Sequence, residues 1–164
     1  MSLCQIALAG LAAVSVLGHS GRDRFVEHML KAHNVPRAAV GLGPLRWDPR
    51  LAADAAVWAR QLSRQGRLVH ERQSIEGENL WRGTVGAFDY EDMVDDWANE
   101  RADYQPGLFP EVSRTGNWRD VGHYTQMVWR DTSQVGCAMA QDRQWDYLVC
   151  RYSPPGNWSG QRAY

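Results

Sequence analysis

The sequence lacks any cluster of basic residues, and this absence excludes one class of partner. The 18 Lys and Arg residues are balanced by 19 Asp and Glu residues, which gives a formal net charge of −1 at pH 7. Lys31 is the sole lysine, and the arginines are spread along the chain. Because phosphate backbones are bound by clustered positive charge, we do not expect this protein to bind nucleic acid.

Internal repeats, low-complexity tracts and long linkers are also absent. A chain of 164 residues suits one domain and is long enough to bury a hydrophobic core. We therefore expect a single domain over residues 21–164, and we expect it to be a monomer.

An apolar run of membrane-spanning length is missing as well. Residues 3–17 are apolar or small apart from Cys4, Gln5 and Ser15. This run is short for a membrane span but typical of the core of a secretory signal. We predict a signal peptide over residues 1–20, although no Lys or Arg precedes the apolar run; an uncleaved anchor or a misassigned start is the alternative. The mature chain is then expected to be secreted or periplasmic, without a stable membrane span.

Cysteine is scarce, with three residues in the whole chain. Cys4 would leave with the signal, so the mature domain keeps Cys137 and Cys150. An even pair in an oxidising compartment favours a disulfide. Two buried free thiols are the alternative.

A predicted β-hairpin supports this bridge. Its strands cover residues 133–140 and 145–152, and placing Cys137 opposite Cys150 makes one face of the hairpin apolar. The same register pairs Val135 with Tyr152 and Met139 with Leu148. Opposed residues of antiparallel strands have Cα atoms about 4.5–5.5 Å apart, which suits a disulfide.

Hydrophobic periodicity predicts four helices, over residues 22–33, from 49 to 65, from 90 onward and over 124–129. A turn containing Pro36 is expected to follow the first. The second has Asp48 as its cap, a proline at its first position and Gly66 at its end, which are the residues that favour helix termini.

Four ionisable residues stand out against this pattern: His70, Glu78, Glu100 and His123. Glu100 comes three residues after Trp97, near the centre of the apolar stripe of the third helix. A carboxylate there needs a partner, unless the helix has ended and releases it to solvent. His123 precedes the fourth helix, where positive charge is disfavoured, so we expect a neutral imidazole. Such an imidazole can bind a metal or accept a proton, although a packed histidine is the alternative.

His70 and Glu78 are weaker candidates when each is taken alone. The pair His70-Glu71 begins like the zinc-protease motif H-E-x-x-H, but the fifth position is Ser74, so the motif fails. An exposed loop histidine is the alternative for His70. The Gly before Glu78 and the Asn after it predict a tight turn that aims the carboxylate.

Several segments together resemble the CAP superfamily, the SCP domain of cysteine-rich secretory proteins, antigens and pathogenesis-related proteins. They are GHYTQMVW at 122–129 with VGCA at 135–138, YLVCRYSPPGN at 147–157, GENL at 77–80, and the opening HN, R and PLRWD between 33 and 48. The resemblance covers about residues 22–158. Because the extra cysteines and hinge domain of eukaryotic members are absent, the chain looks like a bacterial-type single-domain member.

The resemblance implies an α+β fold, a three-layer α-β-α sandwich with a small, mostly antiparallel sheet. It also implies that His70, Glu78, Glu100 and His123 form a cleft tetrad. In such a tetrad His70 and His123 bind a divalent metal such as zinc, which is not required for the fold, and the glutamates line the same cleft. A bridge between the two cysteines of the hairpin is similar to one in relatives.

The resulting functional hypothesis is a secreted protein whose cleft binds a divalent metal or a small polar ligand. Lipid or sterol binding is permitted by the resemblance, with Trp81, Phe88 and Tyr104 as candidate lining residues and core packing as their alternative. A metal-assisted hydrolase would need a glutamate as third zinc ligand, and no Gly-x-Ser-x-Gly elbow is present. The sequence therefore favours a binding protein over an enzyme, with a structural or signalling module as a further alternative.

Overall fold

The computed structural model describes the backbone of residues 12–164 and the side chains of residues 21–164. The helices are α1 (Ala12–Ala39), α2 (Pro49–Gln65), α3 (Tyr90–Asn99) and α4 (Gly122–Met127). The strands are β1 (Arg46–Trp47), β2 (Gly77–Thr84), β3 (Gln134–Gln141) and β4 (Trp145–Ser153), and two 3₁₀ turns cover Glu100–Ala102 and Trp118–Asp120.

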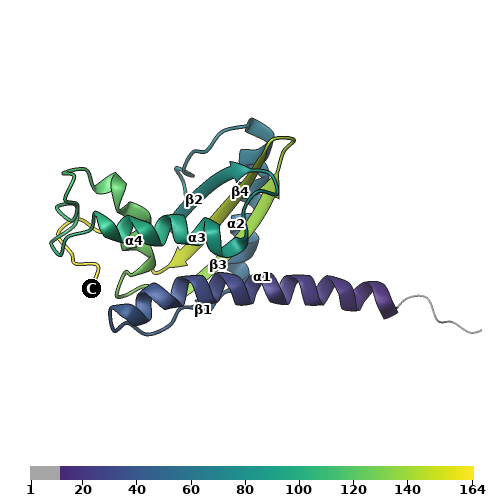
Figure 1. The fold of residues 1–164 in the computed structure, drawn as a ribbon, viewed down its shortest axis with the longest axis horizontal. Coiled ribbons are helices and arrows are strands. Elements are labelled where there is room, and N and C mark those ends of the chain that lie inside the picture. Colours follow the sequence, from purple (N-terminus) through teal and green to yellow (C-terminus); the bar gives the residue numbers. More distant parts are fainter. Residues whose placement is uncertain (1–11) are drawn as a thin grey trace, which may run out of the picture.

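The strands form one sheet in the order β1-β3-β4-β2, in which β1 is parallel to β3 and the other pairs are antiparallel. Helix α2 covers one face, while α1 and α3 lie on the other (Figure 1). Strand β4 is buried on both sides. Leu148 and Cys150 belong to the core shared with α1 and α3, whereas Tyr147 and Val149 pack under α2. The predicted α+β sandwich is confirmed.

The hairpin register is also the predicted one. Cys137 pairs with Cys150, Val135 with Tyr152, and Met139 with Leu148. The two cysteines form a disulfide whose Cα atoms are 4.1 Å apart.

Replacing both cysteines with alanine is expected to lower the free energy of unfolding by about 2–3 kcal/mol, because the bridge restricts the unfolded chain. The bridged residues are separated by 13 positions. Urea denaturation with and without dithiothreitol measures this. The reductant should destabilise the wild type and leave the double variant unchanged; equal effects on both would contradict the prediction.

Helix α2 begins and ends as predicted. The Asp48 carboxylate accepts a hydrogen bond from Arg50 N at 2.7 Å, and Gly66 closes the helix with a φ of 63°. The helix can approach the sheet closely because of Gly136 on β3. A Cβ at that position would lie 2.2 Å from Ala52 N.

Helix α1 is longer than predicted. It continues through Pro36 to Ala39, and Gly41 follows with a φ of 75°. Tertiary contacts hold its last turns. The Arg37 guanidinium donates to the carbonyl oxygens of Gly43, Met127, Trp129 and Thr132. Such contacts offset the local preference of proline for a helix end.

The predicted signal peptide stays a prediction. Residues 1–11, including Cys4, lie outside the described residues, and 12–20 are described only as backbone of α1. None of the helices in the described part of the chain combines the length and apolar character that crossing a bilayer requires.

The aromatic residues considered for a lipid groove pack mainly in the core. Trp81 and Tyr104 are buried, and Phe88 is 42% exposed but lies edge-on against Trp81, with ring centroids 5.1 Å apart. Core packing therefore accounts for Trp81 and Tyr104, whereas Phe88 is partly exposed beside Trp81.

Candidate functional site

Four segments far apart in the sequence bring His70, Glu78, Glu100 and His123 together. His70 lies in the loop after α2, Glu78 on β2, Glu100 just after α3 and His123 in the first turn of α4. A cavity of about 510 Å³, here called the tetrad pocket, is lined by His70, Glu78, Asn79, Phe109, Trp118, Arg119, Gly122, His123 and Asn157. Glu100 does not line this pocket, but it bonds His123, which does.

Glu100 holds both the ring and the backbone of His123. Its Oε1 lies 2.6 Å from His123 Nδ1, and its Oε2 accepts hydrogen bonds from the backbone N–H groups of His123 (2.9 Å) and Tyr124 (3.0 Å). Trp97 stacks on the imidazole, with ring centroids 5.8 Å apart. Helix α3 thus ends at Asn99, and Glu100 faces α4 instead of solvent.

The same bonds explain why α4 covers 122–127 instead of the predicted 124–129. A carboxylate that accepts from free N–H groups stabilises a helix start at that point. Here the acceptor comes from another segment, so the local sequence does not contain the signal.

Glu78 holds His70 in a similar way. Its Oε1 lies 2.6 Å from His70 Nδ1 and 3.2 Å from the backbone nitrogen of Glu71, which donates to it. The predicted tight turn at Glu78 is wrong. Residues 77–84 form β2, and Glu78 pairs with Arg151 on β4. The pairing with a buried neighbouring strand decides the conformation here.

Both imidazoles are therefore oriented by a carboxylate. An ionised carboxylate only accepts hydrogen bonds, so Nδ1 of each ring is the donor, and in the neutral form of the ring the free lone pair is at Nε2. Metal-binding histidines are commonly oriented in this way by a second group. His70 and His123 are therefore the residues of this pocket that could hold a divalent cation, each through its Nε2 atom.

Arg151 and Glu71 are site residues that the sequence reasoning missed. The Arg151 side chain is 1% exposed, and its Nη2 lies 3.1 Å from Glu78 Oε2 and 2.5 Å from Glu71 Oε2. The contact with Glu78 has ion-pair distance but lacks the alignment of a hydrogen bond. The sequence did contain a signal for Arg151. It lies between Cys150 and Tyr152 in a strand expected to be buried, and a buried charge needs partners.

Another histidine, His33, lies within 4.8 Å of the two bridged sulfur atoms. A cysteine binds a metal through its thiolate. These two sulfur atoms are joined in a disulfide, so this group does not fit a metal. His33 Nδ1 donates to Met29 O at 2.7 Å, and His33 Nε2 accepts from the Tyr152 hydroxyl at 2.8 Å. His33 is therefore a packed core residue with both ring nitrogens hydrogen-bonded.

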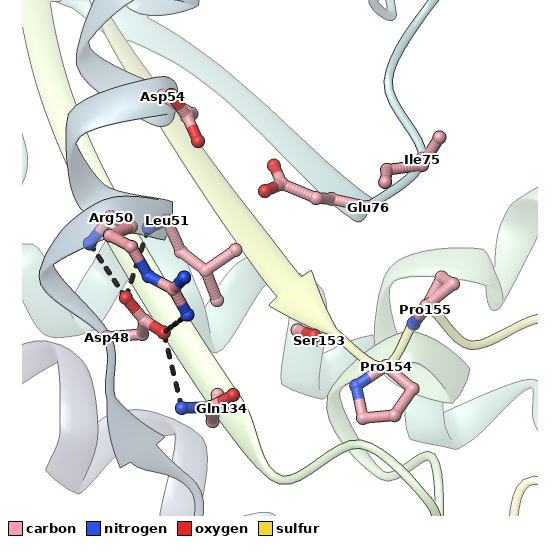
Figure 2. A pocket seen from close by; sticks show the side chains of 10 residues that line it. All are labelled: Asp48, Arg50, Leu51, Asp54, Ile75, Glu76, Gln134, Ser153, Pro154 and Pro155. Carbon is pink, nitrogen blue, oxygen red and sulfur yellow. Dashed lines mark hydrogen bonds and ion pairs between the residues drawn. The ribbon is translucent and has the colours of Figure 1, made fainter.

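Figure 2 shows a second pocket, between the start of α2 and the end of β4, where Asp54 and Glu76 face each other. Burial raises the pKa of Glu76, and hydrogen bonding, chiefly from Arg50 N, lowers that of Asp48. Glu76 Oε2 lies 3.9 Å from Arg151 Nε, so Arg151 connects this pocket with the tetrad pocket. None of the predicted site residues lines it.

Comparison with known proteins gives consistent matches over almost the whole chain. The profile of the Cysteine-rich secretory protein family (CAP) matches residues 30–152. A pathogenesis-related protein of PR-1 type from Sambucus nigra is 36% identical, covering 99% of this chain and 96% of its own. Pathogenesis-related protein 1A from Nicotiana tabacum is 38% identical, with 91% and 87% covered. These relatives are plant proteins, so the expectation of a bacterial-type member is not borne out.

Solved structures share the fold. The crystal structure of NaASP2 with Zn²⁺ has a TM-score of 0.71 at 24% identity, covering 85% of this chain and 84% of its own. The hookworm platelet inhibitor also has a TM-score of 0.71, at 21% identity, with 87% and 75% covered.

Proposed function

This chain belongs to the cysteine-rich secretory protein family, CAP, and we propose that it is a secreted binding protein whose His70 and His123 hold a divalent cation such as Zn²⁺. The family description supports an extracellular location. The observation that carries the proposal is the matched orientation of the two imidazoles. Each Nδ1 lies 2.6 Å from a carboxylate oxygen, which leaves each Nε2 free.

The protein's own residues divide into two roles. His70 and His123 would contact the cation, and Glu78 and Glu100 would orient them without contacting it. Glu100 is already engaged by three N–H groups, and Glu78 by His70, Glu71 and Arg151. Once bound, the cation would supply positive charge and open coordination positions for an oxygen ligand.

This division favours binding over hydrolysis. A catalytic zinc typically has three protein ligands, and a hydrolase here would need Glu78 or Glu100 as the third. Moving either carboxylate to the metal would release the histidine that it orients. NaASP2, which has the same fold, was crystallised with Zn²⁺, and this agrees with a metal-binding role.

Isothermal titration calorimetry with Zn²⁺ on the full chain at pH 7.5 tests the proposal. We expect one ion per chain, and loss of binding in His70→Ala and in His123→Ala, because each variant removes one of two ligands. Glu100→Gln should weaken binding roughly 10–100-fold, since a partner that orients a metal ligand has an effect of this size.

His28→Ala is the matched control. This histidine lies on α1 and bonds Glu91 on α3, away from the tetrad pocket. It should bind zinc like the wild type. Unchanged zinc heats in His70→Ala or His123→Ala, or equal losses in His28→Ala, would contradict the proposed site.

A further inference from the structure

We propose that the tetrad pocket binds an organic anion, with the guanidinium of Arg119 contacting its charged oxygen atoms and the side chains of Phe109 and Trp118 contacting its apolar part. The inference rests on the proposed function, because the cation at His70 and His123 would contact the same anion. It assigns a ligand class to the pocket.

The carboxylates near the pocket are already compensated by hydrogen-bond donors. Glu100 accepts from three N–H groups, and Glu78 interacts with His70, the Glu71 backbone and Arg151. The end of the pocket near Glu78 is nevertheless acidic, because Glu71, Glu76 and Glu78 share Arg151. An acidic end beside the His70 imidazole suits a cation.

Arg119, unlike these carboxylates, carries a charge that is not compensated. It lines the tetrad pocket, and among the described side chains of 21–164 its guanidinium makes no ion pair or hydrogen bond. Its side chain is exposed at the pocket rim. The pocket lining is therefore mixed in charge, because it contains Glu78 and two histidines together with the uncompensated positive charge of Arg119.

The local structure holds this guanidinium in place. It lies over the Trp118 ring, 4.9 Å from the ring centroid, and Phe109 packs edge-on against Trp118 at 5.2 Å. A Cβ at Gly122 would lie 3.2 Å from the Trp118 ring, so the absence of a side chain there lets the ring lie against the start of α4, next to His123. A guanidinium stacked on an aromatic ring keeps its N–H groups free for a carboxylate or phosphate.

These features together select the ligand class. A metal ion and a guanidinium both favour anionic oxygen, and Phe109 and Trp118 offer aromatic surface beside it. Asn157 does not compete, because its amide bonds Thr125 and the Gly122 carbonyl. A planar or apolar carboxylate satisfies all of these groups, whereas a neutral analogue leaves the guanidinium without a partner.

Titration of the zinc-loaded full chain with sodium benzoate, followed by the ¹H–¹⁵N NMR shift of the Trp118 indole N–H, tests this inference. We expect saturable binding and a dissociation constant raised roughly tenfold in Arg119→Gln, as loss of one charge-assisted hydrogen bond predicts. Arg143→Gln is the charge-matched control. Arg143 is exposed in the β3–β4 turn, and its variant should bind benzoate like the wild type.

Any one of three benzoate results would overturn the inference on its own: an unchanged dissociation constant in Arg119→Gln, an equal loss in Arg143→Gln, or equal affinity for benzoate and neutral benzyl alcohol. The zinc heats measured without benzoate separate this from failure of the proposed function. If zinc binds and benzoate does not depend on Arg119, the anion site is wrong and the metal site stands. If zinc alone does not bind, the metal site fails, and the anion inference fails with it.

Discussion

Replacing Arg151 with methionine is expected to lower the free energy of unfolding by about 3–5 kcal/mol, because breaking a buried ion pair leaves a buried charge without compensation. The Arg151 side chain is 1% exposed, and Glu78, its ion-pair partner at 3.1 Å, is 7% exposed. Methionine fills a similar volume, so the measured loss reports mainly the charge. Urea denaturation at pH 7 measures it.

A double-mutant cycle assigns this loss to Glu78. Arg151→Met should cost less in a Glu78→Gln background, because the glutamine carries no charge to compensate. Arg143→Met controls for the change in net charge and should stay within about 0.5 kcal/mol of the wild type. An Arg151→Met loss that is equally small would mean that Glu71, Glu76 and Glu78 do not need this partner.

Acidification from pH 6.5 to pH 4 is expected to remove about 3 kcal/mol of stability through His33 alone. This residue lies on α1 and is fully buried against the sheet. Its burial lowers the pKa of the imidazole from 6.5 to about 4. The nearby positive charge of Arg37 also lowers this pKa, and the bond to the Met29 carbonyl raises it.

The direction of this change in stability follows from proton binding. Between pH 4 and 6.5 the unfolded chain binds a proton at His33 that the folded chain does not, so acid favours unfolding. The contribution is complete above pH 6.5 and is lost as the pH falls to about 4. Chemical denaturation at steps of 0.5 pH unit measures it.

His33→Gln provides the comparison for this pH dependence, because glutamine can donate to Met29 O and accept from the Tyr152 hydroxyl without titrating. The variant should show a flatter dependence of stability on pH over this window. Other groups titrate in both proteins, so the difference between the two curves isolates His33. Parallel curves would show that burial of this imidazole does not lower its pKa.

The sequence indicated some residues of the tetrad pocket but not the contacts between them. His123 and Glu100 were both recognisable, one next to a helix start and one on an apolar stripe. Their contact was not, because it joins residues 23 positions apart. The role of Glu100 at the start of α4 depends on that contact. Arg151 and Arg119 were missed because their importance lies in which charges surround them, and that is a property of the folded chain.

Local chemistry let the sequence alone determine the limits of α2, the hairpin register and the disulfide, whereas the sandwich layers were expected from the resemblance to the CAP superfamily. Side chains alternate along a strand with period two, so shifting the register by one residue would have exposed the apolar face and separated the cysteines. Only the tertiary structure decided that Glu78 lies on a strand and that α1 continues through Pro36. It also decided that the buried Arg151 pairs with three glutamates, while Arg119 at the tetrad pocket has no ion-pair partner among the described side chains. Those outcomes depend on pairings between distant segments, whose energies are set by burial and charge in three dimensions.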